Sequence, residues 1–221
     1  MPAYIEIMHD QACGVAPVDP VELGLQILSP LVGELEVVRD TRQIKVTDPN
    51  LDTVRADKIR WPQIMPANFT IVLTSRELVT ADNVASKSGE RVLKKLAGIA
   101  FIGRDVAIIG TKSRRDTDVS MTVAHEVAHL YEVLSDNAST NNHCTDDTCI
   151  MYPDGGDYET VQSIDRSSRI KRMKSRFGRH EMVGVELPKI SKFCAPCEVD
   201  LMKQSTVMST RLAMKMMRNF K

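Results

Sequence analysis

Apolar and polar residues alternate along the chain with two periods, one typical of strands and one typical of helices. Short apolar runs bounded by turn residues predict strands at 2–8, 34–38, 69–74, 99–102 and 106–109. Apolar residues at helical spacing, together with capping residues, predict helices at 21–31, 48–59, 86–96, 118–136 and 198–220. Gly103, Arg104 and Asp105 join two of the strands as a hairpin. This order of elements predicts an α/β fold in which a sheet packs on helices.

The helix predicted at 118–136 carries the segment HEVAH, in which His125 and His129 are four residues apart. Residues at this spacing lie on the same face of a helix, so the two imidazoles can bind one Zn²⁺. Glu126 lies beside them and is free to act as a base. The alternative interpretation is an ordinary helix with surface charges and a core histidine.

Four of the five cysteines fall into two pairs. Four residues separate Cys144 from Cys149, and two residues separate Cys194 from Cys197. A tetrahedral Cys₄ zinc site tolerates both spacings. The alternatives are free thiols in packed positions and a redox pair at Cys194 and Cys197. Cys13 is most simply a buried or bystander thiol.

Composition and charge argue against some classes of function for this chain. The chain has 221 residues, of which 43% are hydrophobic and 26% charged, as expected for one soluble globular domain. The 29 basic and 29 acidic residues cancel, which argues against general attraction to nucleic acid or to an anionic membrane. The N-terminus lacks a signal-like apolar stretch, and no segment approaches the roughly 18 apolar residues of a membrane span. We therefore expect a cytoplasmic protein. The sequence predicts no particular oligomeric state.

Taken together, HEVAH, the run HCTDDTCIM from His143 to Met151, and CAPC at 194–197 resemble the archaemetzincins. The signature of this metzincin family is HExxHxxGxxHC, four residues, CxM and a later CxxC. The order of the motifs matches, and the resemblance extends over the chain from about residue 48. The spacing differs, because Glu132 holds the position of the family's Gly and His143 follows His129 by fourteen residues instead of six. The interval from Met151 to Cys194 is also longer than usual.

The resemblance implies a mixed, mostly parallel sheet with an antiparallel edge hairpin, and a smaller irregular C-terminal subdomain that holds the Cys₄ zinc. It implies one metalloprotease domain over 1–221, divided near residue 135. His143 would be the third ligand, and the seven residues from Asn137 to His143 can span about 23 Å when extended, which is enough to reach the metal. Asp136, Glu132 and Asp146 are the alternative ligands. Met151 would form the Met-turn beneath the metal without binding it.

By the same resemblance, one strand would bind the substrate backbone by strand addition. The residues of this strand are Gly98, Ile99, Ala100, Phe101 and Ile102. An ordinary buried hairpin is the alternative.

The predicted function is a zinc-dependent peptidase with two zinc ions per chain, one catalytic and one structural. Three neutral imidazoles leave the catalytic zinc an open position for water, and Glu126 would serve as general base and then as general acid. Two other functions stay open. One is a zinc-stabilised scaffold or binding protein without turnover. The other is a nucleic-acid binder that uses the Cys₄ site and the basic segment 166–179, which carries seven Lys or Arg residues.

Overall fold

The computed structural model describes residues 3–10, 18–44, 53–56, 68–85, 91–133, 143–146, 148–152 and 192–219. The basic segment 166–179 lies outside these residues. The described elements in chain order are β1 (Ala3–Asp10), α1 (Asp19–Val32), β2 (Leu35–Ile44), β3 (Thr53–Arg55), β4 (Asn68–Thr74), β5 (Glu77–Ala85), β6 (Arg91–Leu96), β7 (Gly98–Phe101), the 3₁₀ helix η2 (Ile102–Arg104), β8 (Val106–Gly110), α2 (Asp116–Leu130) and α5 (Ala195–Asn219).

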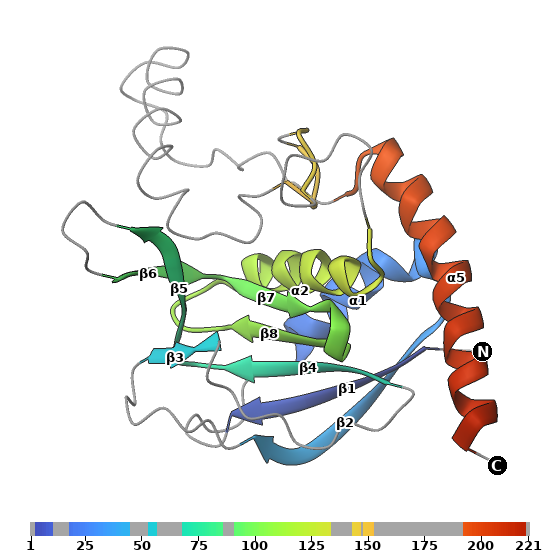
Figure 1. Cartoon of the computed structure of the whole chain (residues 1–221), viewed down its shortest axis with the longest axis horizontal. Helices are drawn as coiled ribbons and strands as arrows, with labels where there is room; N and C mark the ends of the chain where they lie inside the picture. Colours follow the sequence, from blue (N-terminus) through green and yellow to red (C-terminus); the bar gives the residue numbers. More distant parts are fainter. Residues whose placement is uncertain are drawn as a thin grey trace.

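A five-stranded sheet forms the centre of the fold, in the order β2-β1-β4-β8-β7 (Figure 1). The pairs β1/β2, β1/β4 and β4/β8 are parallel, whereas β7 pairs with β8 in the antiparallel sense. The hairpin turns through η2 and Asp105, whose φ of 55° is left-handed. The predicted fold class, a mixed and mostly parallel sheet with an antiparallel edge hairpin, is confirmed.

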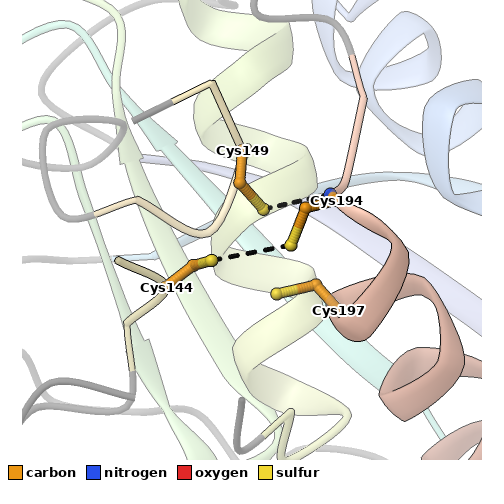
Figure 2. A group of neighbouring side chains, drawn as sticks. All are labelled: Cys144, Cys149, Cys194 and Cys197. Atoms are coloured by element: carbon orange, nitrogen blue, oxygen red, sulfur yellow. Dashed lines mark hydrogen bonds between the residues drawn. The ribbon is translucent and has the colours of Figure 1, made fainter. Parts of the chain in front are cut away.

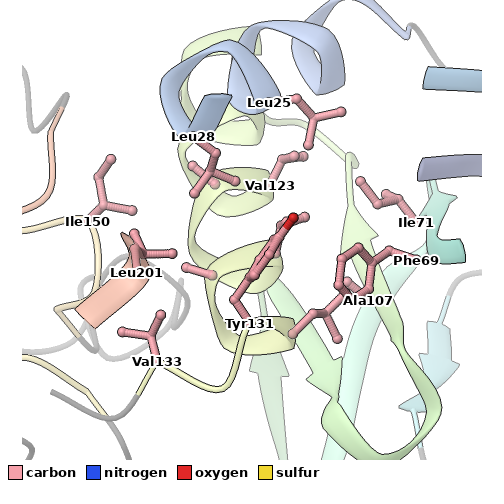
Figure 3. Close-up of a cluster of buried hydrophobic side chains, with 14 of the residues drawn as sticks. Leu25, Leu28, Phe69, Ile71, Ala107, Val123, Tyr131, Val133, Ile150 and Leu201 are labelled. Carbon is pink, nitrogen blue, oxygen red and sulfur yellow. The ribbon is translucent and has the colours of Figure 1, made fainter. Parts of the chain in front are cut away.

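Helices α1 and α2 cover one face of this sheet (Figure 1). Ile71 and Phe69 of β4 contribute to the core on this side, together with Leu25 and Leu28 of α1 and Val123 of α2 (Figure 3). Side chains of this size stabilise a fold by about 1.5–3 kcal/mol each when fully buried. The core therefore holds α2, with its HEVAH segment, firmly against the sheet.

A second sheet, in the order β3-β5-β6, packs on the opposite face. It replaces two predicted helices, because 53–55 and 91–96 form strands. Strand β6 pairs antiparallel with β5, for example through Leu78 with Leu96, and β5 itself was not predicted. The apolar residues of β6 satisfied helical spacing, but their pairing with a distant strand decided the structure, as is common for short segments.

Several other described elements lie near their predicted ranges. Strands β1 and β4 and helix α1 lie close to their predicted ranges, whereas β2 continues beyond residue 38 to Ile44. Gly33, whose φ is 88°, follows α1. The Gly33 N–H donates to the Ser29 carbonyl at 3.0 Å, which closes the last turn. The helix predicted at 198–220 is present as α5, which begins at Ala195 and ends at Asn219. None of the described helices is long and apolar enough to cross a membrane.

Candidate metal centres

Helix α2 buries the three polar side chains of the HEVAH segment. Asp116 and Asp118 lie in its first turn, where carboxylates interact favourably with the positive end of the helix. His125, Glu126 and His129 are 1%, 3% and 9% exposed. Burial of this many polar side chains on one helix is costly unless they have a shared function or shared partners.

The structure brings His143 to the two histidines of α2. The Nε2 atom of His129 lies 3.1 Å from Nε2 of His125 and 3.3 Å from Nε2 of His143. Tetrahedral zinc with bonds of about 2.0–2.1 Å would hold its nitrogen ligands about 3.3 Å apart. Both separations are close to the spacing that a zinc ion requires, and all three ligand atoms lie within 4.8 Å of one another, although His143 follows His129 by fourteen residues.

Burial keeps the helix histidines neutral. Burial lowers the pKa of His125, the hydrogen bond to Ile150 partly opposes this, and the nearby His143 adds to the lowering, so that the pKa is about 4. Burial, together with the charges of His125 and His143, lowers the pKa of His129 to about 2. Neutral imidazoles are the form that binds metal, so at neutral pH protons hardly compete with a metal for these two side chains.

A backbone carbonyl fixes the ring of His125. Its Nδ1 lies 2.7 Å from the Ile150 carbonyl oxygen, which can only accept a hydrogen bond. The proton therefore resides on Nδ1, and the lone pair of Nε2 faces the other two histidines. The sequence carried no signal for this contact, because any residue at position 150 supplies the same carbonyl group.

Helix α2 ends at Leu130, so the prediction that it continues to residue 136 was wrong. The chain turns at Glu132, whose φ of 56° is left-handed and which stands where the archaemetzincin signature has a Gly. The Glu132 carboxylate accepts a hydrogen bond from Arg211 Nη1 of α5 at 2.5 Å.

The alternative third ligands do not join the histidines in the described residues. Glu132 points to Arg211, and the Asp146 carboxylate accepts hydrogen bonds from the N–H and hydroxyl of Thr148 at 2.9 and 2.7 Å. Asp136 lies outside the described residues. Among the described residues, the group of side chains around these histidines that could hold a metal consists of His125, His129 and His143.

The four paired cysteines meet in a second group (Figure 2). Cys144 and Cys149 come from the segment after α2, Cys194 immediately precedes α5, and Cys197 lies in the first turn of α5. The Sγ atoms of Cys144 and Cys194 are 3.6 Å apart, close to the roughly 3.8 Å that tetrahedral zinc with bonds of about 2.3 Å imposes. The thiols thus form one group of four, as a Cys₄ site requires. Cys13 lies outside the described residues.

Backbone N–H groups favour a thiolate in this group. The N–H groups of Met151 and Cys194 donate to Cys149 Sγ at 3.4 and 3.3 Å. A hydrogen bond with the Cys197 thiol and these two N–H groups lower the pKa of Cys149 to about 5, although burial opposes the shift. The same pairing raises the pKa of Cys197. Cys149 is therefore the thiol of this pair that ionises more readily, and a bound metal would displace the remaining protons.

The two groups share one short segment of chain. His143 precedes Cys144, and Ile150 follows Cys149. The Cys144 N–H donates to the Met151 carbonyl at 2.8 Å, which closes the segment into a loop. The Met151 side chain is fully buried in the core cluster that also contains Cys144, Cys149 and Cys197. Its place beneath the catalytic metal stays a prediction.

Strand β7 is the terminal strand of the sheet formed by the described residues. The Gly110 N–H donates to the Ala97 carbonyl at 2.8 Å, and Gly98 lies opposite Ile109. Hydrogen-bonded and non-bonded pairs alternate in an antiparallel ladder, so Gly98 and Ala100 direct their N–H and C=O groups toward the open edge. The strand ends at Phe101, one residue earlier than predicted, because Ile102 begins η2.

Comparisons with known proteins concern the fold. No protein-family model matches the sequence. No curated protein matches it. Among solved structures, the archaemetzincin of Methanopyrus kandleri is similar, with a TM-score of 0.54 and 15% identity over 93% of this chain and 96% of that chain. The archaemetzincin of Archaeoglobus fulgidus, complexed with malonate, matches with a TM-score of 0.46 and 17% identity over 89% of this chain and 99% of that chain. The chain therefore has an archaemetzincin-like fold, with two groups of side chains that fit zinc.

Proposed function

We propose that this chain is a zinc-dependent peptidase. The observation that carries the proposal is the gathering of three imidazoles, in which Nε2 of His129 lies 3.1 Å from Nε2 of His125 and 3.3 Å from Nε2 of His143. A site with only three protein ligands leaves a position open for water, which distinguishes catalytic zinc from structural zinc. The Cys₄ group supplies four ligands and would hold a second, structural zinc.

Each residue of the proposed site would have a separate chemical role. His125, His129 and His143 would hold the catalytic zinc, which when bound acidifies water and polarises a carbonyl group. Glu126 would take a proton from the attacking water and pass it to the leaving amine. Gly98 and Ala100 would bind the substrate backbone in an extended conformation through their N–H and C=O groups. The chemistry at these residues suits a peptide lying along β7.

The test is a digest of a complex peptide mixture by the wild type and by Glu126→Gln. The amide is nearly isosteric with the carboxylate but cannot accept the proton, so we expect cleavage by the wild type to be lost in the variant. Zinc content, measured by elemental analysis, should stay equal because Glu126 is not a ligand. Equal cleavage by both proteins contradicts the proposed role of Glu126. No cleavage by either, with zinc bound, favours a zinc-stabilised scaffold.

A further inference from the structure

Gly98 faces Glu126 at very short range. A Cβ atom at position 98 would lie 2.7 Å from Cγ of Glu126, 2.9 Å from its Oε1 and 2.7 Å from Cγ2 of Thr122. Real Cβ atoms essentially never come this close to another heavy atom. The φ of Gly98 lies outside the left-handed region, which among the described glycines only Gly33 occupies. Glycine is therefore required at position 98 for space and not for its backbone conformation.

Thr122 cannot move aside to accommodate a larger residue. Its Oγ1 donates to the Asp118 carbonyl at 3.0 Å and accepts from Arg114 Nη2 at 2.5 Å. Both bonds fix the χ1 angle of a β-branched side chain that has few rotamers available in a helix. A methyl group at position 98 would therefore displace the side chain of Glu126, or push strand and helix apart.

Arg114 opposes any separation of strand and helix. Its Nη1 donates to the carbonyls of Ala97 and Gly110 at 3.2 and 2.9 Å. Its Nη2 donates to the Asp118 carbonyl at 2.8 Å and to Thr122. One guanidinium thus joins the residue before β7, the end of β8 and the first two turns of α2.

We infer that Gly98 and Arg114 are positioning residues for Glu126. Arg114 sets the separation between β7 and α2, and the missing side chain of Gly98 leaves the space that the Glu126 side chain fills. The same Gly98 directs its N–H and C=O to the open edge, so a peptide bound there lies next to the Glu126 carboxylate. This inference rests on the proposed function, because it assigns the base its place relative to the substrate backbone.

The experiment compares Gly98→Ala with Gly103→Ala. The control makes the same chemical change in η2, where an added Cβ would meet no atom within 4 Å. For each protein we would measure zinc per chain, kcat and KM on a peptide that the wild type cleaves, and we would crystallise Gly98→Ala. We expect kcat of Gly98→Ala to fall about 100-fold, as for a catalytic group misplaced by about 1 Å, with unchanged zinc and a displaced Glu126 side chain. Gly103→Ala should behave as the wild type.

Two further variants separate the effect of Gly98 from the effects of its neighbours. Arg114→Lys keeps the charge but cannot make the four bonds of the guanidinium, so kcat should fall while zinc is retained, even if Gly98→Ala does not fold. Gly98→Ala combined with Thr122→Ser removes only the contact with Cγ2, so the double variant should remain impaired. Full recovery of kcat in the double variant would assign the effect to Thr122 and overturn the role of Gly98.

The inference also fails if kcat of Gly98→Ala equals that of Gly103→Ala, or if its crystal structure shows Glu126 in the wild-type position. A wild type that binds zinc but cleaves no peptide refutes the proposed function separately. In that case the crystal structure still decides whether Gly98 fixes the position of the Glu126 side chain.

Discussion

Replacement of Cys149 by Ser is expected to weaken zinc binding at the three histidines as well as at the cysteines. Ile150 follows Cys149, and its carbonyl accepts the Nδ1 proton of His125 at 2.7 Å. His143 precedes Cys144, another member of the Cys group. A metal at the cysteines would therefore hold two of the three histidines in place, one through a hydrogen bond and one through the chain itself.

The two connections set the size of the effect. Loss of an outer-shell partner of a metal-bound histidine typically lowers metal affinity 10–100-fold, or about 1.4–2.8 kcal/mol. A chain of fourteen residues between His129 and His143 that must close without help costs about 2 kcal/mol of entropy. Three cysteines remain in the variant, so each connection is only partly lost. We expect zinc affinity at the histidines to fall between about 10-fold and 1000-fold.

The assay is zinc retained per chain across a series of competing chelators. Wild type is expected to release zinc in two steps, and His143→Ala should lose one of them. In Cys149→Ser, the step in which zinc is released from the cysteine site should disappear. The step in which zinc is released from the three histidines should occur already with weaker chelators. Cys197→Ser tests the same connection from α5 without altering the sequence around Ile150, and Cys13→Ser is the matched control outside the group of four. Histidine affinity equal in Cys149→Ser, Cys197→Ser and Cys13→Ser would refute the coupling.

Two further predictions concern the stability of the metal-free protein. Glu132 adopts a left-handed φ of 56° and forms an exposed ion pair with Arg211. Both Glu132→Gly and Glu132→Ala lose the ion pair, but only Ala keeps the backbone strain, so Glu132→Gly should unfold at a higher denaturant concentration, by about 1 kcal/mol in the free energy of unfolding. Equal denaturation midpoints of the two variants would contradict this prediction. Burial lowers the pKa of His125 to about 4 and that of His129 to about 2, so below pH 6.5 the unfolded chain binds more protons than the folded one. Stability of the chelator-treated protein should be highest above pH 6.5 and fall by about 1.4 kcal/mol per pH unit and per histidine from there toward pH 4, which urea titrations at pH 7.5 and 5.5 would detect.

The candidate metal groups were predictable because their chemistry depends on side chains at short spacings. His125 and His129 lie on one helix turn, and each cysteine pair is local in sequence. The third histidine, His143, could not be predicted from local spacing alone, because only its neighbour Cys144 and the order of the motifs identified it as a ligand. The structure places all seven side chains in the two expected groups. Their roles as ligands stay a prediction that the zinc measurements test.

The second sheet and the positioning contacts were not predictable in the same way. Strands β5 and β6 depend on pairing with each other and on apolar contacts across the central sheet, and no local pattern encodes these. The hydrogen bond from His125 to the Ile150 carbonyl could not be predicted, because a backbone carbonyl is the same for every residue type. Gly98 carried a partial signal, because an isolated glycine beside a strand often marks the close approach of another group. The sequence offered no way to identify that group as Glu126.

The long interval between His129 and His143 becomes understandable from where the helix ends. Helix α2 ends at Leu130, and the chain turns at Glu132, the position at which the archaemetzincin signature has its glycine, so the helix itself is not extended. The additional residues follow the turn, and lengthening a closed loop from six to fourteen residues costs only about 0.7 kcal/mol. On the other side, His143 is held by Cys144, whose N–H binds the Met151 carbonyl at 2.8 Å. The position of the third histidine is thus set from the cysteine side, which makes its distance from the helix in sequence a weak criterion for rejecting it.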